Sequence, residues 1–360
     1  MHNLDELSLI NDIDSAGMGR ALAGFPEQCR EAEALAAAVD LKALGLPGAA
    51  GGISAVVTLG MGGSGIGGDV VRTLVESELT VPFLVNKSYE LPGFVDASTL
   101  VVAVSFSGET EETLAAFESA VTAGAQILVM TGGGRLLERA LELDLPLLKV
   151  PTGLQPRAAL GYLALPQLML LRRLGLIDSA NRDVEEAINQ LDLLSAAYAS
   201  AVPTTENAAK KLALELKDLI PVIYGSDGLT AAAALRWKCQ FNENSKTPAF
   251  WNVFSELNHN EIVGWDETAR PARTCRLIVL RDSGENARVQ KRIGITVEMV
   301  RANVAGVTEI RSSGESPLAR LLSLTYLGDY ASYYLALLNG IDPTPVESIR
   351  QLKERLNQNN

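Results

Sequence analysis

The sequence predicts an α/β protein of two tandem, doubly wound domains, each a parallel sheet covered by helices on both faces. The first observation is that, from residue 53 onward, short apolar runs rich in β-branched residues alternate with longer helical stretches. The second is a glycine-rich turn at residues 60–68, between one such run and a helix. The third is that the second half repeats the plan of strand, turn and helix, without a strong sequence repeat.

The first part of the chain predicts an N-terminal helical segment, residues 1–45, and then a first α/β domain, residues 46–180. Residues 27–44 are alanine-rich and periodic, and residues 47–52 form a glycine-rich linker. The strongly apolar stretch at residues 161–174 predicts a buried packing helix. Strands are expected at residues 56–59, 81–85, 100–104, 126–130 and 146–150, and helices at residues 70–78, 111–123 and 135–142.

Residues 181–360 predict a second α/β domain of the same kind. An amphipathic helix at residues 182–200 leads into it, and a polar turn at residues 225–228 follows its first strand. Strands are expected at residues 219–224, 250–251, 276–280 and 307–310, and helices at residues 230–242, 318–338 and 346–356. Gly340 and Pro343 end the long helix before the last one.

The composition indicates an ordinary globular protein. Of the 360 residues, 47% are hydrophobic and 21% are charged, and no apolar run reaches the length of about 20 residues that spans a bilayer. The acidic N-terminus lacks the basic start of a signal peptide, so no membrane association is expected. Three widely spaced cysteines, Cys29, Cys239 and Cys275, predict a reducing, cytoplasmic location.

The charge and the scarcity of histidine exclude several functions. A formal net charge of −12 without a basic stripe argues against nucleic-acid binding. An anionic substrate must therefore be held by local helix ends, hydroxyls and a few cations. With two histidines, of which His2 is terminal, and three cysteines, no metal site is expected.

The glycine-rich turn, Gly60-Met61-Gly62-Gly63-Ser64-Gly65, predicts an anion site at a helix N-terminus. It also satisfies the GxGxxG pattern of dinucleotide-binding domains. That pattern requires an acidic residue about 20 positions further on, at the end of the second strand. Here the second strand ends in Asn86-Lys87, and Glu90 lies several residues beyond it, so a dinucleotide is not favoured.

A second polar turn, Ser105-Phe106-Ser107-Gly108-Glu109-Thr110, follows the next buried strand run. Its three hydroxyls suit the compact head of a phosphomonoester, which carries three acceptor oxygens. An ordinary Ser/Thr helix cap is the simpler interpretation of this turn alone. Because neighbouring parallel strands aim both turns at the same sheet edge, we expect a single phosphate site there.

These two turns resemble the phosphate loops of the sugar isomerase (SIS) domain. The second half strengthens the resemblance, since Asn242-Glu243-Asn244-Ser245-Lys246 and Asn258-His259-Asn260-Glu261 are similar to active-site segments of bifunctional phosphoglucose/phosphomannose isomerases. The similarity covers nearly the whole chain. It implies two SIS-type domains and metal-independent isomerisation of hexose 6-phosphates, from glucose and mannose 6-phosphate to fructose 6-phosphate, without a cofactor.

The resemblance also implies the catalytic residues. Glu243 would move a proton between C2 and C1 through a cis-enediol(ate), and His259 would open the sugar ring. In the resembled family this histidine comes from the neighbouring subunit, which implies a homodimer. Lys353 matches a lysine near the ring oxygen, and Arg157 matches the arginine that stabilises the enediolate. A helix-end or loop position with no chemistry is the simpler interpretation of each residue alone.

The phosphate would be held by residues of the two turns. The residues concerned are Gly62, Gly63, Ser64, Ser105, Ser107 and Thr110. The family often has Tyr and Asn where this chain has Phe106 and Glu109, and the acidic Glu109 is compatible with a phosphate only if it points away. Tolerance of both C2 epimers depends in the family on a small hydroxyl residue near the C-terminal lysine, a place for which Thr344, Val346 and Glu347 compete here.

Three other functions compete with the isomerase. A non-catalytic, regulatory SIS protein that binds sugar phosphates would keep the phosphate loops and lose the base, whereas this chain retains Glu243, His259, Arg157 and Lys353. A glucosamine-phosphate-forming SIS enzyme would need an ammonia source, and the sequence offers no N-terminal cysteine nucleophile. The third is the dinucleotide-dependent oxidoreductase, which the missing acidic residue disfavours.

Overall fold

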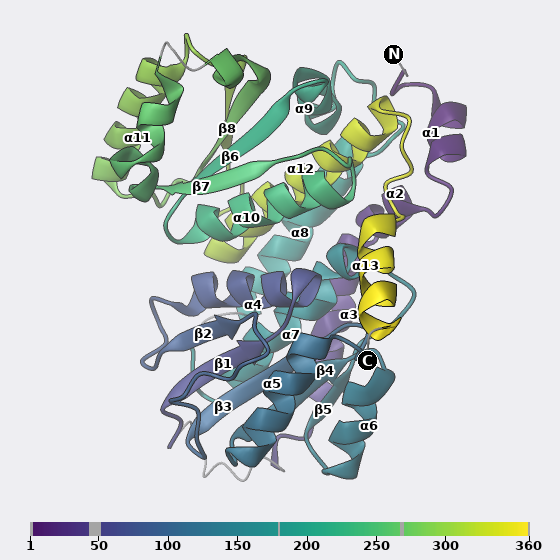
Figure 1. Cartoon of the computed structure of the whole chain (residues 1–360), viewed down its shortest axis with the longest axis vertical. Helices are drawn as coiled ribbons and strands as arrows, with labels where there is room; N and C mark the ends of the chain where they lie inside the picture. The colour runs from purple at the N-terminus through teal and green to yellow at the C-terminus, as the bar shows by residue number, and fades with distance from the viewer. Residues whose placement is uncertain (1–2, 43–51, 179–180, 267–269, 359–360) are drawn as a thin grey trace. The chain divides into compact units, whose positions relative to one another are not determined.

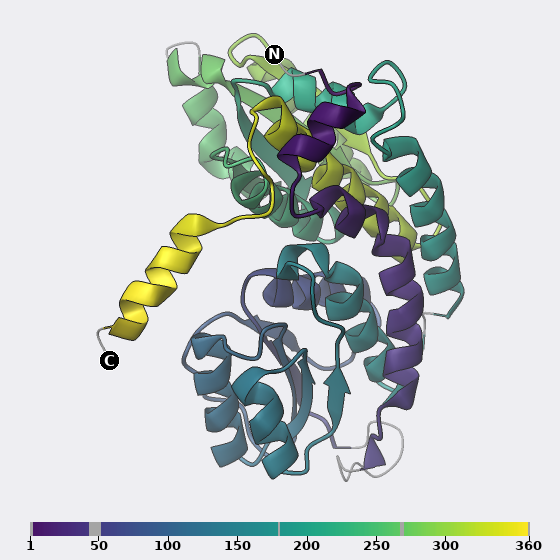
Figure 2. The ribbon, with the colours of Figure 1, turned by 90° about the vertical axis from the view of Figure 1, so that its right-hand side faces the viewer.

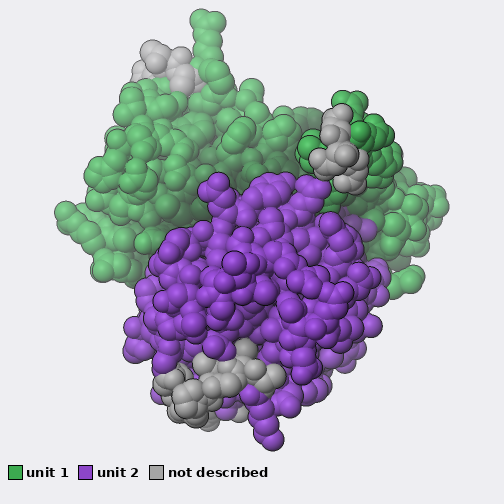
Figure 3. Space-filling view, turned by 60° about the horizontal axis from the view of Figure 1, so that its bottom comes forward, with its two compact units in different colours: residues 1–23, 193–312, 324–360 green, residues 24–192, 313–323 purple. Residues whose placement is uncertain are grey.

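A computed structural model describes residues 3–42, 52–178, 181–266 and 270–358 and divides the chain into two compact units (Figure 3). Unit 2 comprises residues 24–192 and 313–323, and unit 1 the remaining segments. Helix α12 (Pro317–Leu338) therefore contributes to both. The domain boundaries expected after residues 45 and 180 follow chain order and stay a prediction. Most of the predicted linker, residues 47–51, lies outside the described residues.

Unit 2 contains a five-stranded parallel sheet in the order β2-β1-β3-β4-β5 (Figure 1). Its strands are β1 (Ala55–Leu59), β2 (Phe83–Asn86), β3 (Thr99–Ser105), β4 (Gln126–Thr131) and β5 (Leu147–Lys149). Its helices include α3 (Phe25–Ala38), α4 (Gly62–Val75), α5 (Glu111–Thr122), α6 (Gly134–Glu142) and α7 (Leu160–Arg173). The predicted strands and the doubly wound parallel fold are confirmed.

The core of unit 2 explains why these segments fold as they do. Every residue of β3 is buried, as expected for a central strand covered on both faces. Residues 160–171 of α7 are all buried too, which confirms the predicted packing helix. Gly67 lets α4 approach α7 closely, because a Cβ at this position would lie 2.6 Å from the carbonyl oxygen of Leu163.

Unit 1 contains a four-stranded parallel sheet in the order β7-β6-β8-β9, the order of the first four strands of unit 2. Its strands are β6 (Ile220–Ser226), β7 (Phe250–Phe254), β8 (Cys275–Arg281) and β9 (Gly306–Arg311). Other elements are α1 (Leu7–Ile13), α2 (Met18–Ala23), α9 (Ala208–Leu216), α10 (Leu229–Glu243), α11 (Ala287–Val300), α13 (Glu347–Gln358) and the 3-10 turns η3 (Glu256–His259), η4 (Glu261–Trp265) and η5 (Arg270–Thr274). Helix α8 (Asn181–Tyr198) contributes to both units, because its residues up to 192 belong to unit 2.

Helix α10 is fixed to α12 by a buried ion pair. The Arg236 guanidinium donates to both carboxylate oxygens of Asp329, at 3.0 and 2.7 Å, and Gln240 Nε2 donates to the same carboxylate at 2.7 Å. Both charged residues are almost completely buried, at 3% and 2% exposure. Trp237 Nε1 also donates to the carbonyl of Leu324 at 2.8 Å. The end of α10 is therefore held at a defined position in unit 1.

Helix α12 carries four of the five members of a buried tyrosine cluster in unit 1, and the fifth ends α8. Its members are Tyr198, Tyr326, Tyr330, Tyr333 and Tyr334. The hydroxyl of Tyr326 donates to the carbonyl of Leu22 at 2.7 Å, and that of Tyr334 to the carbonyl of Tyr198 at 2.5 Å. Burial raises the pKa of all five phenols, that of Tyr198 to about 12. No helix in the described part of the chain is long and apolar enough to span a bilayer.

Candidate active site

The two predicted phosphate loops follow the neighbouring strands β1 and β3 of unit 2. Because these strands are parallel, both loops lie at the carboxyl edge of the sheet. The strand order reverses between β1 and β3, so this edge is the topological switch point at which doubly wound folds bind ligands. The expectation of adjacent loops at one sheet edge is confirmed.

The first loop leaves a helix N-terminus without a side-chain cap. Met61 is the N-cap of α4 and its side chain makes no capping bond, while Gly62 takes a positive φ of 52°. At Gly63 a Cβ would lie 2.6 Å from the carbonyl oxygen of Pro156 and 3.1 Å from the amide nitrogen of Arg157. Glycine here lets the buried Arg157, which is 4% exposed, sit against the first turn of α4.

The second loop is joined to the first by the hydroxyl of Ser64, which accepts from the amide of Phe106 at 3.2 Å. The hydroxyls of Ser105 and Thr110 lie 3.0 Å apart, and Ser105 Oγ accepts from the amide of Gly108 at 3.1 Å. Ser107 is exposed and accepts from the amide of Glu109 at 3.2 Å. Ser64 and Ser105 thus shape the loops, whereas Ser107 and Thr110 are the more accessible hydroxyls.

Glu109, the acidic residue in the second loop, is bound by Arg135. Its carboxylate accepts from the amide and from the Nε of that residue, both at 2.8 Å. These two hydrogen bonds hold the pKa of Glu109 below its ordinary value. The carboxylate is directed to the start of α6, where a guanidinium offsets its charge.

Glu243, the candidate base, is the last residue of α10 and is half-buried. It lies on the wall of a cavity of about 770 Å³ in unit 1, which α10 and the chain around residues 341–349 enclose. Val346 and Glu347 are among the residues that line this cavity, and Thr344 is not. Asp342 fixes the second wall, because its carboxylate accepts from Ser15 Oγ at 2.7 Å and from the Thr344 amide at 2.9 Å.

The residues after Glu243 are held by polar contacts. Asn244 Nδ2 donates to the hydroxyl of Ser332 at 3.0 Å, and Ser245 Oγ donates to the carbonyl of Phe241 at 2.7 Å. The side chains of Asn244 and Ser245 are buried, at 0% and 1% exposure. They support the helix end on which Glu243 stands.

Lys246 is a residue for which the sequence indicated no role. Its Nζ donates to the carbonyl of Glu243 at 2.5 Å and to that of Pro343 at 3.2 Å, so it joins the two walls of the cavity. Its φ of 54° lies in the left-handed region, where glycine is the usual residue after a helix. The sequence signals are its place in the segment that resembles an active-site segment and a lysine three residues after a helix end, where backbone carbonyls lack partners.

His259 is the exposed last residue of η3, and its neighbours are the anchors of this segment. Asn258 Nδ2 donates to Thr296 Oγ1 at 2.8 Å, and the Glu261 carboxylate accepts from the hydroxyl of Tyr224. The Glu261 contact and, above all, burial raise the pKa of Tyr224. His259 does not line the cavity that contains Glu243.

Lys353 lies on α13, whose side chains are exposed throughout the described part of the helix. Figure 2 shows α13, in yellow, standing apart from the rest of unit 1. The first turn of α13 lines the cavity, and Lys353 does not. Unit 1 therefore carries Glu243, His259 and Lys353 separately, and unit 2 carries the phosphate loops with Arg157 beside them. Among the described residues, no group of three or more His, Cys, Asp or Glu side chains is placed to hold a metal.

Comparisons with known proteins match both halves of the chain. The profile of the SIS domain matches residues 54–144, and that of the bacterial phospho-glucose isomerase C-terminal SIS domain matches residues 205–356. A bifunctional phosphoglucose/phosphomannose isomerase of Caldicellulosiruptor bescii is 47% identical over 84% of this chain and 90% of its own length. One of Aquifex aeolicus is 37% identical, with the same coverage of both chains.

Solved structures share the fold at low identity. A glucose-6-phosphate isomerase like protein from Thermus thermophilus superposes with a TM-score of 0.64 at 19% identity, over 97% of this chain and all of the other. The C-terminal domain of a glucosamine-fructose-6-phosphate aminotransferase from Francisella tularensis gives a TM-score of 0.71 at 16% identity, over 91% and 98%. These structures share the fold, and the identity of 47% to the Caldicellulosiruptor bescii enzyme over 84% of this chain establishes that the chain belongs to the bifunctional phosphoglucose/phosphomannose isomerase family.

Proposed function

We propose that this protein interconverts hexose 6-phosphates, taking glucose 6-phosphate and mannose 6-phosphate to fructose 6-phosphate without a metal or a cofactor. The observation that carries the proposal is the half-buried carboxylate of Glu243 on the wall of a cavity of about 770 Å³. Isomerisation needs one carboxylate that takes the proton from C2 and returns it at C1. The helix end that bears Glu243 is held by buried polar contacts, which suits a positioned base.

The remaining roles follow the chemistry of the reaction. The exposed imidazole of His259 would transfer protons during ring opening, since histidine is the side chain most often used for proton transfer. Arg157 would stabilise the enediolate with a fixed positive charge, and Lys353 would act near the ring oxygen. The uncapped start of α4, at Gly62 and Gly63, and the hydroxyls of the second loop would hold the phosphate.

We also propose that two copies of the chain assemble and that His259 serves the site of the neighbouring copy. The support is that His259 is exposed and does not line the cavity of Glu243 in its own chain. A reducing, cytoplasmic location is proposed because Cys29, Cys239 and Cys275, all within the described residues, form no disulfide with one another.

The purified, EDTA-treated protein is expected to form fructose 6-phosphate from each of the two aldose phosphates. Removing the hydroxyls of Ser107 and Thr110 as Ser107→Ala and Thr110→Val should raise KM by tenfold or more, because phosphate contacts are lost, and should lower kcat less. If the wild type converts glucose 6-phosphate but not mannose 6-phosphate, the proposal that mannose 6-phosphate is a substrate is wrong. Binding of both sugars without turnover would overturn the isomerase in favour of a regulatory sugar-phosphate sensor.

Replacing Lys246 tests whether this residue positions Glu243 for catalysis or only stabilises the fold. In Lys246→Gly the left-handed backbone strain disappears together with the link between Glu243 and Pro343. We expect the free energy of unfolding to change by less than about 1 kcal/mol, because relieved strain offsets the lost hydrogen bonds. We expect kcat to fall by tenfold or more with KM little changed, as measured by steady-state kinetics.

Two further variants complete this test. Lys246→Arg keeps donors that can reach both carbonyls and should restore part of kcat, whereas Lys246→Met keeps the strained backbone and should be both less stable and less active. An unchanged kcat in Lys246→Gly would show that Lys246 does not position the base.

A further inference from the structure

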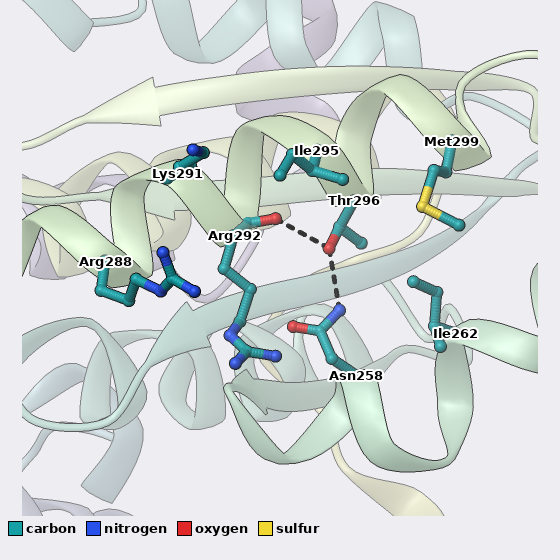
Figure 4. A pocket seen from close by; sticks show the side chains of 8 residues that line it. All are labelled: Asn258, Ile262, Arg288, Lys291, Arg292, Ile295, Thr296 and Met299. Carbon is teal, nitrogen blue, oxygen red and sulfur yellow. Dashed lines mark hydrogen bonds between the residues drawn. The ribbon is translucent and has the colours of Figure 1, made fainter.

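A second cavity lies on unit 1, between α11 and the segment that contains η3 and η4 (Figure 4). Its volume is about 330 Å³, which is within the range of about 300–1,000 Å³ for small-molecule pockets. The residues that line it are Asn258, Ile262, Arg288, Lys291, Arg292, Ile295, Thr296 and Met299. None of them is acidic, although the chain carries a net charge of −12.

The cavity is basic at one end and apolar at the other. Arg288, Lys291 and Arg292 stand in the first two turns of α11, whereas Ile295 and Met299 stand in its later turns. A spacing of three or four residues places these side chains on one face of the helix, as Figure 4 shows. From Arg288 to Met299 this face extends about 16 Å at the helical rise per residue.

The positive charges of this face have no acidic partner. In the part of the chain that the structure describes, none of the side chains of Arg288, Lys291 and Arg292 forms an ion pair. By contrast, Arg139 and Arg350 each contact two carboxylates. The first turn of α11 contains no acidic residue either, so Arg288 lies at the positive end of the helix dipole, and Lys291 and Arg292 add two positive charges in the next turn. A bound anion would relieve the repulsion among these charges.

The middle of the wall offers a polar contact. Asn258 Nδ2 donates to Thr296 Oγ1 at 2.8 Å, and Thr296 Oγ1 donates to the carbonyl of Arg292 at 2.9 Å, so the orientation of the amide is fixed. Asn258 Oδ1 is left buried without a partner among the described residues.

We propose that this cavity is a binding site for a nucleoside phosphate. The phosphate groups would lie against Arg288, Lys291 and Arg292, and the base would lie over Ile295 and Met299. An elongated anion with one charged and one apolar end matches the division of the cavity, whereas a simple inorganic anion would leave half of it empty. The site is one residue from His259, but its ligand binding does not depend on the proposed isomerase activity.

Methionine methyl groups report this site and the phosphate loops separately. The chain has six methionines, of which Met299 lines the cavity and Met61 lies within the first predicted phosphate loop, as the N-cap of α4. Protein labelled with ¹³C in the methionine methyls would be titrated with ADP, adenosine and pyrophosphate. Met299→Leu and Met61→Leu assign the two resonances. We expect ADP to shift the Met299 resonance saturably, and adenosine and pyrophosphate to bind at least tenfold more weakly there.

The triple variant Arg288→Gln, Lys291→Gln, Arg292→Gln should weaken the ADP effect on Met299 by tenfold or more and leave Met61 unaffected. A control that removes three exposed cations elsewhere, Lys149→Gln, Lys211→Gln and Arg311→Gln, should bind ADP as the wild type does. The proposal is overturned if ADP leaves Met299 unshifted, or if the shift survives in the triple variant. A shift of Met299 with anionic lipid vesicles and none with ADP would overturn it in favour of a membrane-facing surface.

Discussion

Glu243→Gln is expected to lower kcat by roughly 10²–10⁴-fold for both aldose phosphates, because an amide cannot take the proton from C2. The substitution preserves the shape of the side chain, and the helix end is held by other residues, Asn244 and Ser245. The free energy of unfolding and the affinity for substrate should therefore stay near the wild-type values. Steady-state formation of fructose 6-phosphate, with binding measured by calorimetry, tests this expectation.

A mixture of two inactive variants tests which copy of the chain supplies His259 to each site. If Glu243 and His259 of one site come from different copies, mixed dimers of Glu243→Gln and His259→Ala contain one intact site and regain part of the activity. No regained activity in demonstrably mixed dimers would contradict the donation across the interface. Retention of near-wild-type kcat in Glu243→Gln would contradict its role as the base.

Asp329→Ala is expected to cost about 3–5 kcal/mol of unfolding free energy, the largest stability effect that we predict for one side chain. Removing the carboxylate takes the bidentate ion-pair partner from the buried guanidinium of Arg236 and a hydrogen-bond acceptor from Gln240. Urea unfolding followed by circular dichroism measures the loss. Activity at low temperature should also fall, because α10 carries Glu243.

The paired replacement Arg236→Met with Asp329→Leu is the control, since it removes both charges together. Replacing a buried ion pair by apolar residues of similar volume is often close to neutral, so most of the stability should return. A single-variant loss below about 1 kcal/mol, or no recovery in the double variant, would show that the pair is not what secures α10.

The elements that the sequence predicted well are those with a strong local pattern. Residues 100–104 of β3 form a continuous apolar run because the strand is buried on both faces, and residues 160–171 of α7, all buried, are apolar apart from Gln167 for the same reason. The distribution of the chain between two units has no such local signal. Helices α1 and α2 belong to unit 1 and α3 to unit 2, and the assignment depends on contacts between distant segments, such as the bond from Tyr326 to Leu22.

The candidate site also combines features that local sequence predicts with features that depend on distant residues. The phosphate loops were predictable because a strand, a glycine-rich turn and a helix start are adjacent in sequence. The hydrogen bonds from Phe106 to Ser64 and from Lys246 to Pro343 could not be predicted. The residues of the first pair are 42 positions apart in the sequence and those of the second 97. The roles of Glu243, His259, Lys353 and Arg157 stay predictions, because they depend on substrate and on assembly.

The buried tyrosine cluster of α12 limits the pH range in which the folded state is stable. A phenol whose pKa is raised by burial holds its proton in the folded state, while an unfolded chain releases it near pH 10. Each such phenol therefore contributes stability below pH 10 that is lost, at up to about 1.4 kcal/mol per pH unit, as the pH rises toward the folded-state pKa.

With five of these phenols together, we expect abrupt unfolding above pH 10, with phenolate absorbance and loss of helicity in one step. Gradual ionisation of these five phenols in the still-folded protein, beyond that of the exposed Tyr89, would contradict this. The same interior that surrounds α12, to which α10 is bound, thus makes the protein sensitive to strong base.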